Sequence, residues 1–347
     1  MQTKTRAKLL TAAAAIVTAA VLLTNQPQTN ADILKADSTN NIVYIYTADD
    51  GYTVVGVKDT GKLSSAVQSR GDKKVRYEQT AEFLVKPPET YIQSTIIDNN
   101  KHKQFLPFMA VYKDIELNWP SDGSRTGYWR PAPGGVSIGH PEVTAGTLGG
   151  QICYNDNCNC FITNAHVAGG LNGAKVGDPI YQPGVRDGGT SSDVIGNIVV
   201  LVTPRKDVNN TVDAAIVCGS AETIYPEVYG IGKVSGVAEP YIEMQATKCG
   251  RTTSCTTLEL IGMDVTVKVG YQIGRKWVYY TFAHQLLWDG VSAGGDSGSK
   301  IVANGQMAAL LFAGNGSQVM SNDPDYILQA IPGASFPGMQ MEAEAYP

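Results

Sequence analysis

The segment Phe161-Ile162-Thr163-Asn164-Ala165-His166-Val167-Ala168-Gly169 contains the residues around which the rest of the sequence can be organised. Its apolar start predicts a strand, and its small residues predict a tight turn that presents the imidazole. A histidine in such a turn can accept a proton from a hydroxyl and return it to a leaving group. Taken alone, His166 would more often be a structural histidine, which is what we expect of His140 and His284, while His102 looks exposed.

A second segment, Gly294-Gly295-Asp296-Ser297-Gly298-Ser299, surrounds one serine with glycines. A serine hydroxyl is a poor nucleophile until a base removes its proton, and the oxyanion formed by its attack needs hydrogen-bond donors. Glycines allow a sharp turn that exposes the hydroxyl and points the amides of Gly295 and Ser297 at one spot. The alternative for this segment alone is an ordinary glycine-rich surface turn.

A third segment, Thr211-Val212-Asp213-Ala214-Ala215-Ile216-Val217, places an acid at the start of an apolar run. Burying a carboxylate is costly unless it is hydrogen-bonded, and orienting an imidazolium is one compensation. Asp193 is the competing acid, but it is nearer to His166 in sequence and lacks the same apolar frame. The order histidine, aspartate, serine is one of three known for catalytic triads, so the three segments together predict an activated Ser297.

These segments resemble those of a known family. TNAHVAG, VDAAIV and GGDSGS are similar to the three active-site boxes of the trypsin/chymotrypsin superfamily. Gly250-Arg251-Thr252-Thr253 resembles the GRTTG segment of bacterial members such as the streptogrisins and alpha-lytic protease. The resemblance covers about residues 130–331 and none of residues 32–128. It implies an all-β, chymotrypsin-like fold of two six-stranded β-barrels, with the triad in the cleft between them.

The resemblance also implies a reaction, the hydrolysis of peptide bonds through an acyl-enzyme. Ser297 attacks, His166 shuttles the proton, Asp213 orients the imidazole, and the amides of Gly295 and Ser297 hold the oxyanion. No metal or organic cofactor is needed, and protein or peptide substrates are the expected partners. Two alternatives stay open. One is a protease scaffold that binds without cleaving; the other is an esterase, although the expected Gly-x-Ser-x-Gly elbow is missing.

The chain departs from the family in how it would hold the oxyanion loop. No Arg-Ile-Val-Gly-Gly activation sequence precedes the first barrel, so a new N-terminus is not expected to pair with Asp296. In the bacterial relatives the arginine of GRTT can satisfy this aspartate. The resemblance therefore implies that Arg251 pairs with Asp296, as structural support for the loop.

The substrate pocket can be placed only through the resemblance. The pocket floor lies six residues before the nucleophile in this family, at Val291, with Ser292 next to it. No acid stands there, so cleavage after lysine or arginine is disfavoured. Phe312-Ala313-Gly314 resembles the strand that lines the pocket and pairs with the substrate backbone by strand addition. We expect a small or medium apolar side chain, with glutamate as the alternative if Ser292 and His284 line the pocket.

Composition agrees with an all-β chain. Among 347 residues there are 37 glycines and 17 prolines, and 43% of the residues are hydrophobic. Short strand-like runs such as PIYQP, VIGNIVVLVTP, AAIVCG, DVTVKVG and MAALLFAG recur between glycine-rich turns. One helix is predicted near the C-terminus, with Asp323 as N-cap and Pro324 at its first position.

Four sections follow one another along the chain. Residues 1–31 have the layout of a signal peptide, with Lys4, Arg6 and Lys8 ahead of an uncharged stretch, which predicts secretion. An uncleaved membrane anchor is the lesser alternative, because the apolar stretch is short for a bilayer span and its many alanines make it weakly hydrophobic. Residues 32–128 form a β-leaning segment, a propeptide or accessory domain, in which NIVYIYT and YTVVGV predict a hairpin. Residues 129–334 form the peptidase domain, and residues 335–347 a tail.

Charge and cysteines limit the partners and the compartment. Loss of the signal would lower the formal net charge from −5 to −8, so nucleic acid and stable membrane association are not expected after cleavage. All six cysteines lie between Cys153 and Cys255, and in an exported chain they predict disulfides. Cys249 could close a hairpin with Cys255, and Cys153 could pair with Cys158 or Cys160, but six cysteines allow fifteen pairings and the sequence leaves the connectivity open. A zinc site of Cys153, Cys158, Cys160 and His166 is the lesser alternative.

Overall fold

The computed structural model describes residues 41–48, 51–59, 75–85 and 117–339, together with Asn30, Ala31 and Leu34. Nearly all of the expected signal peptide (1–31) and most of the expected tail (335–347) lie outside these residues. In the described ranges, no helix is both long enough and apolar enough to cross a membrane. Strands dominate, and helix α3 (Pro324–Ala330) stands near the C-terminus, which confirms the expected all-β class with a terminal helix.

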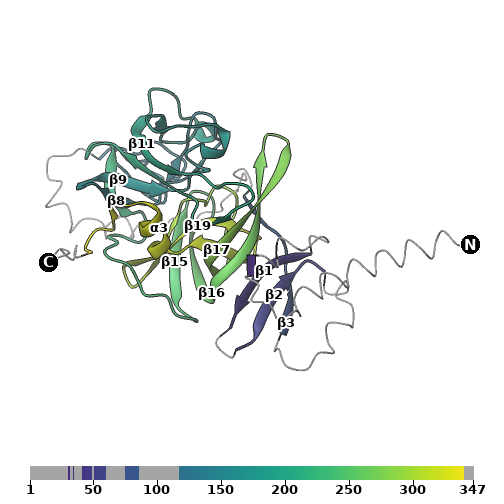
Figure 1. The fold of residues 1–347 in the computed structure, drawn as a ribbon. Helices are drawn as coiled ribbons and strands as arrows, with labels where there is room; N and C mark the ends of the chain where they lie inside the picture. Colours follow the sequence, from purple (N-terminus) through teal and green to yellow (C-terminus); the bar gives the residue numbers. More distant parts are fainter. Residues whose placement is uncertain are drawn as a thin grey trace, which may run out of the picture.

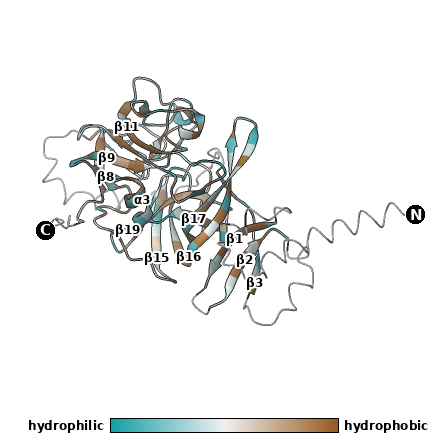
Figure 2. Cartoon of the chain, in the orientation of Figure 1, coloured by the Kyte–Doolittle hydropathy of each residue, from teal (hydrophilic) through white to brown (hydrophobic). Residues whose placement is uncertain are grey.

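The smaller of two large sheets has six strands and lies at the top of Figure 1. In sheet order they are β10 (Pro179–Tyr181), β11 (Val194–Val202), β13 (Ala214–Cys218), β9 (Asn157–Thr163), β8 (Gln151–Tyr154) and β21 (Ala334–Ser335). Valine and isoleucine are frequent in these strands because branched side chains fit a pleated, half-buried surface. Figure 2 shows such apolar residues on β9 and β11. They bury one core between this sheet and the chain that covers it.

The larger sheet has eleven strands and lies below the smaller one in Figure 1. Six of them form the expected second unit: β15 (Gln245–Gly250), β16 (Ser254–Ile273), β17 (Lys276–Gly290), β18 (Lys300–Ala303), β19 (Gln306–Gly314) and β20 (Gln318–Asn322). The sheet exceeds the expected six because strands from elsewhere join it. These are β12 (Asn209–Asn210), β1 (Ile42–Thr47), β2 (Thr53–Val57), β3 (Val75–Gln79) and β4 (Phe83–Val85).

The N-terminal strands share a core with the second unit. The predicted hairpin is present as β1 and β2, with Gly51 in the left-handed conformation (φ 78°) at its turn. Strand β1 then pairs antiparallel with β16, with Tyr44 opposite Val267. Tyr44 and Phe83 are fully buried in one cluster with Phe282 and Phe312 of the larger sheet. This shared apolar cluster ties the β-leaning segment to the site-bearing sheet.

Short elements complete the described chain. Strands β5 (Ala132–Gly134) and β14 (Ile224–Val228) pair in parallel, and β6 (Ser137–Ile138) pairs antiparallel with β7 (Gly146–Thr147). The 3-10 helices are η4 (Gly170–Asn172) and η5 (Val185–Asp187). Helix α3 begins as predicted, because the side chain of Asp323 accepts a hydrogen bond of 2.9 Å from the amide of Asp325 and Pro324 stands in the first turn.

All six cysteines form disulfides. The pairs are Cys153–Cys158, Cys160–Cys218 and Cys249–Cys255. Pairing across the short turns agrees with the sequence expectation, and Cys160–Cys218 joins neighbouring strands β9 and β13. The alternative zinc site does not fit this arrangement, because its three cysteine sulfurs are already bonded to other sulfurs.

Candidate active site

Strand pairing in the smaller sheet brings the predicted base and acid together. His166 follows β9, Asp213 precedes β13, and Thr163 lies opposite Ala215 in the register of these strands. Nδ1 of His166 is 2.6 Å from Oδ2 of Asp213, and the His166 amide donates to Oδ1 at 3.1 Å. The carboxylate therefore holds both the ring and the backbone of His166.

The carboxylate of Asp213 is fully buried and is held in place from several sides. The backbone amide of Asp213 donates to the Asn322 side chain at 3.1 Å, and its backbone carbonyl accepts from the Asn164 side chain at 2.8 Å. These contacts come from both sheets, so Asp213 lies at the junction between them. A buried carboxylate is tolerable because its oxygens are hydrogen-bonded.

Sequence reasoning missed Tyr271, which also binds Asp213. The Tyr271 hydroxyl donates to Oδ2 of Asp213 at 2.8 Å, and its ring meets the His166 ring edge-on with centroids 5.5 Å apart. Burial, and next the charge of Asp213, raise the pKa of Tyr271 well above its usual value, so the hydroxyl stays protonated. Tyr271 is on β16, far from any active-site box, and no local pattern distinguishes it from the other strand tyrosines.

Ser297 comes from the larger sheet, in the turn that precedes β18, and faces the pair from the smaller sheet. Ser297 and His166 line the same hollow. The Ser297 hydroxyl donates to the carbonyl of Phe312 at 3.3 Å, and no hydrogen bond joins it to His166 among the described residues. Catalytic hydrogen bonds of this kind are often long in unliganded enzymes and tighten around substrate.

The turn before Ser297 carries backbone donors of the kind that an oxyanion needs. The Thr252 hydroxyl donates to the carbonyl of Gly294 at 2.8 Å. Because the C=O and N–H of a trans peptide point in opposite directions, this bond turns the Gly295 amide away from Thr252. Gly295 has a φ of 101°, which suits glycine. In the part of the chain described, no protein acceptor is bonded to the amides of Gly295 or Ser297, so both are available to an oxyanion.

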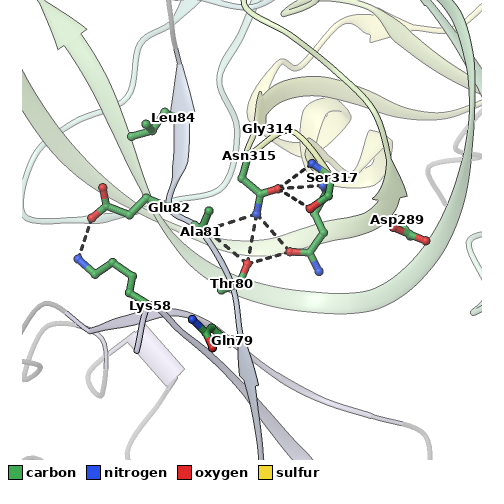
Figure 3. Close-up of a pocket in the computed structure, with 11 residues that line it drawn as sticks. Lys58, Gln79, Thr80, Ala81, Glu82, Leu84, Asp289, Gly314, Asn315 and Ser317 are labelled. Carbon is green, nitrogen blue, oxygen red and sulfur yellow. Dashed lines mark hydrogen bonds and ion pairs between the residues drawn. The ribbon is translucent and has the colours of Figure 1, made fainter. Parts of the chain in front are cut away.

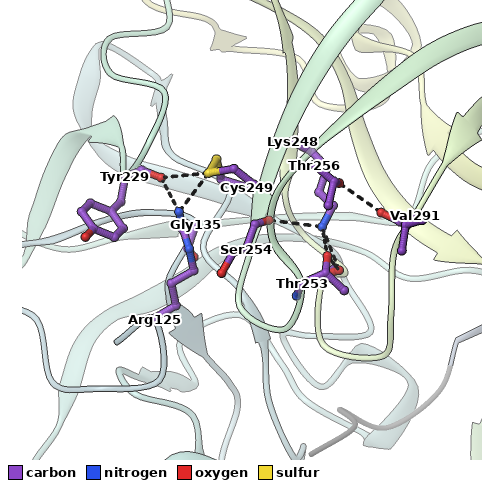
Figure 4. Close-up of a disulfide and its surroundings, with 11 residues drawn as sticks. Arg125, Gly135, Tyr229, Lys248, Cys249, Thr253, Ser254, Thr256 and Val291 are labelled. Atoms are coloured by element: carbon purple, nitrogen blue, oxygen red, sulfur yellow. Dashed lines mark hydrogen bonds and ion pairs between the residues drawn. A yellow bond between two sulfur atoms is a disulfide. The ribbon is translucent and has the colours of Figure 1, made fainter. Parts of the chain in front are cut away.

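Asp296 is buried beneath this turn and is paired with Lys248. Nζ of Lys248 lies 2.9 Å from Oδ2 of Asp296, and both side chains are inaccessible. Oδ1 accepts the amides of Thr252 and Thr253 at 2.9 and 3.0 Å, and the Thr253 hydroxyl donates to Oδ2 at 2.6 Å. Burial alone would raise the pKa of Asp296, but Lys248 and these donors lower it overall. Figure 4 shows Lys248 and Thr253 beside the Cys249–Cys255 disulfide.

The predicted pairing of Arg251 with Asp296 is wrong. The Arg251 guanidinium instead binds Asp187, with Nε 2.7 Å from Oδ2 and Nη2 in contact with Oδ1. The oxygens of Asp296 are already occupied by Lys248 and the threonines, whereas the Arg251 side chain extends to Asp187 at the end of η5. Nη1 of Arg251 also donates to the Thr252 hydroxyl at 3.1 Å. Arg251 thus supports the oxyanion turn through Thr252, while Lys248 neutralises Asp296.

The predicted substrate pocket is partly corrected. Ser292, Ala313 and Gly314 line a hollow beside Ser297, as expected. Val291 is not among the residues that line it and is 50% exposed. Phe312 is fully buried against Phe282, with ring centroids 4.8 Å apart, so only its carbonyl faces Ser297. No charged side chain lines this hollow among the described residues.

His284 lies away from the pocket. Its Nδ1 is 2.6 Å from Oδ1 of Asp264, and its ring stacks on Tyr326 with centroids 4.6 Å apart. The alternative in which His284 helps to bind a glutamate side chain is therefore not supported. His140 has a local role, because its Nδ1 accepts the amide of Glu142 at 3.1 Å.

Comparison with solved structures finds bacterial serine proteases of the chymotrypsin type. Cellulomonas bogoriensis chymotrypsin is 18% identical, over 60% of this chain and 98% of its own, with a TM-score of 0.43. Thermobifida fusca protease A is 18% identical over 60% of this chain and 98% of its own, with a TM-score of 0.45. Nocardiopsis protease is 19% identical over 59% of this chain and 98% of its own, with a TM-score of 0.44. No family model and no curated protein matches the chain. At such low identity, the chemistry has to be inferred from the side chains of the site.

Proposed function

We propose that this chain is a serine endopeptidase that hydrolyses peptide bonds through an acyl-enzyme on Ser297. The observation that carries the proposal is that His166, paired with the buried Asp213, lines the same hollow as Ser297, whose own amide and that of Gly295 have no protein acceptor among the described residues. An ordinary glycine-rich turn would need neither the buried carboxylate nor the free donors.

The proposed steps use only these groups. Oγ of Ser297 attacks the substrate carbonyl while its proton passes to His166, and the amides of Gly295 and Ser297 bind the oxyanion. His166 then gives the proton to the departing amine, which leaves an acyl-enzyme. Water attacks the ester by the same route, with His166 as base, and releases the acid and Ser297. Asp213 keeps the imidazole oriented and stabilises its charged form.

Substrate preference follows from the hollow beside Ser297. The hollow is lined by uncharged residues, among them the small Ser292, Ala313 and Gly314, so it offers no charged partner for a lysine or arginine side chain. A Cβ on Gly314 would lie 2.2 Å from Oγ of Ser292, which shows how closely the two sides approach. A small or medium apolar side chain is the proposed occupant.

We further propose that the enzyme acts outside the cell. The charged start and apolar stretch of residues 1–31 have the layout of a signal peptide, and all six cysteines are in disulfides, which form and persist in oxidising compartments. Protein or peptide substrates are its proposed partners.

Labelling with a fluorophosphonate probe tests the nucleophile directly. Wild type, Ser297→Ala and His166→Ala are compared, and the modified residue is mapped by mass spectrometry. Label on Ser297 that both variants lack supports an activated serine. Folded protein that takes no label, both as the full chain and after removal of residues 32–128, would instead favour a scaffold that binds without cleaving.

A further inference from the structure

Strand β4 stands at the end of the described range 75–85 and lies between β16 and β19 of the larger sheet. Leu84 is paired with Gly314 at the end of β19, and the two strands are antiparallel. On its other side β4 runs parallel to β16, with Phe83, Leu84 and Val85 opposite Val269, Gly270 and Tyr271. A strand of this chain therefore occupies the edge of β19 at which a substrate backbone would add.

The side chains of β4 lie where those of a bound peptide would lie. Leu84 lines the hollow that contains Ser292 and Ser297. Val85, one residue further along, lines the hollow that contains His166 and Ser297. The direction of β4 thus leads from Gly314 toward the proposed catalytic residues, as an antiparallel peptide on β19 would.

The groove between β16 and β19 is shaped for an aliphatic side chain at the Leu84 position. Gly270 is directly opposite Leu84, and a Cβ on Gly270 would lie 3.0 Å from Cδ2 of Leu84. That distance is shorter than an ordinary van der Waals contact. Because Gly270 has no side chain, the groove has room for the side chain of Leu84 at this point. Phe83 is fully buried and anchors the start of β4 in the shared core.

Polar contacts fasten the chain just before β4 to the loop after β19. The Asn315 side chain donates to the Thr80 hydroxyl at 3.2 Å and to the Ala81 carbonyl at 3.3 Å, and the Thr80 hydroxyl is 3.0 Å from Oε1 of Gln318. Figure 3 shows this network beside the ion pair of Lys58 and Glu82, whose atoms are 2.8 Å apart. The N-terminal segment is therefore held to the wall of the proposed substrate cleft.

We propose that the cleft binds an extended peptide as a strand inserted between β16 and β19, with aliphatic side chains at two successive positions, and that β4 is the resident peptide. The inference rests on the proposed function and deepens it: Leu84 and Val85 mark the side chains the cleft selects, and the N-terminal segment blocks access to Ser297 until β4 is displaced. Pairing on both sides makes the cleft selective for extended chains, because each side supplies backbone hydrogen bonds.

The test compares labelling rates of Ser297 by a fluorophosphonate in the full chain. Leu84→Asp places a charge in the apolar groove, and Val75→Asp makes the same change on the edge strand β3, outside the cleft. We expect Leu84→Asp to label roughly tenfold faster than wild type and Val75→Asp to label at the wild-type rate. A synthetic peptide of sequence Thr80–Val85 should then slow the Leu84→Asp variant again. Equal rates for wild type and folded Leu84→Asp would overturn the inference while leaving the proposed function intact.

A folding control, a second variant and a peptide-binding measurement complete the test. Circular dichroism checks folding, and Leu84→Pro, which removes a backbone donor without adding charge, replaces Leu84→Asp if that variant unfolds. If no form of the chain labels, the proposed function fails and a fluorescent Thr80–Val85 peptide decides the inference. Binding to the Leu84 variant but not to wild type supports a resident β4, and binding to neither protein, or equally to both, overturns it.

Discussion

The hydroxyl of Tyr271 and the side chain of His166 share one oxygen, Oδ2 of Asp213, at 2.8 and 2.6 Å. Tyr271 comes from β16 of the larger sheet, whereas the other two residues come from the smaller sheet. The tyrosine therefore connects the two sheets at the point where the imidazole is oriented, and it is a positioning residue for the proposed reaction.

Replacing Tyr271 with phenylalanine should lower the rate of the proposed reaction. Loss of the donor leaves Oδ2 of Asp213 with one hydrogen-bond partner fewer, so the carboxylate orients the His166 ring less firmly. The maximum rate kcat should therefore fall about tenfold with little change in KM. Tyr280→Phe is the control, because Tyr280 packs edge-on against Tyr271 without binding Asp213. A kcat of Tyr271→Phe equal to that of Tyr280→Phe would show that the tyrosine only fills space.

Replacing Thr252 with valine should weaken oxyanion binding. The variant removes the hydroxyl that fixes the Gly294 carbonyl and, through that peptide, the Gly295 amide. We expect kcat to fall about tenfold to a hundredfold with little change in KM, and a boronate inhibitor to bind less tightly in proportion. Thr256→Val, which removes a hydroxyl bonded to the carbonyl of Val291, is the matched control. A rise in KM at constant kcat would contradict this role.

Replacing Lys248 with methionine should destabilise the fold more than replacing Arg251. Methionine at 248 leaves the buried Asp296 carboxylate without its cation, which costs about 3–5 kcal/mol. Arg251→Met leaves the Lys248–Asp296 pair intact and should cost less. Urea unfolding under non-reducing conditions measures both free energies, with Lys276→Met on the exposed hairpin end as control. A loss for Lys248→Met no larger than that for Lys276→Met would contradict the role given to the Lys248–Asp296 pair.

Replacing Lys300 with methionine should stabilise the fold, in contrast to the same change at Lys248. Lys300 is buried, and burial lowers its pKa from 10.5 to about 7, while its Nζ donates to the Gln151 carbonyl at 2.6 Å. Between these pH values the unfolded chain binds the extra proton, so this residue makes stability rise with pH by about 1.4 kcal/mol per unit. Lys300→Met should therefore be more stable than wild type at pH 7, with an advantage that shrinks toward pH 10. A difference that stays constant from pH 7 to 9 would refute the assignment.

Much of the fold and site could be predicted from local patterns. The turn that presents His166, the glycines around Ser297 and the N-cap Asp323 each depend on a few neighbouring residues. The β1–β2 hairpin and the Cys249–Cys255 disulfide close over short loops, so their partners are close in sequence. Such features are set by turn chemistry and side-chain alternation, which a single sequence displays directly.

The errors concern contacts between distant segments. Arg251 seemed the natural cation for Asp296, yet Lys248 is fully buried beside the carboxylate and Arg251 reaches Asp187 at the end of η5. Two basic residues three positions apart on one strand end can both approach the same turn, and only the packing around them decides which does. Val291 was misplaced for a similar reason, since the direction of its side chain depends on the register of its neighbours.

Sequence alone therefore determined the strand-rich class, the terminal helix and the segments that carry His166, Asp213 and Ser297, because these follow from periodicity and local backbone preference. Only the tertiary structure decided that Tyr271 binds Asp213 and that Leu84 lies against Gly314. Both contacts depend on how strands far apart in the chain are paired and how two sheets pack. Strand pairing carries almost no local signal, because many apolar strands are interchangeable until the whole core excludes all but one arrangement.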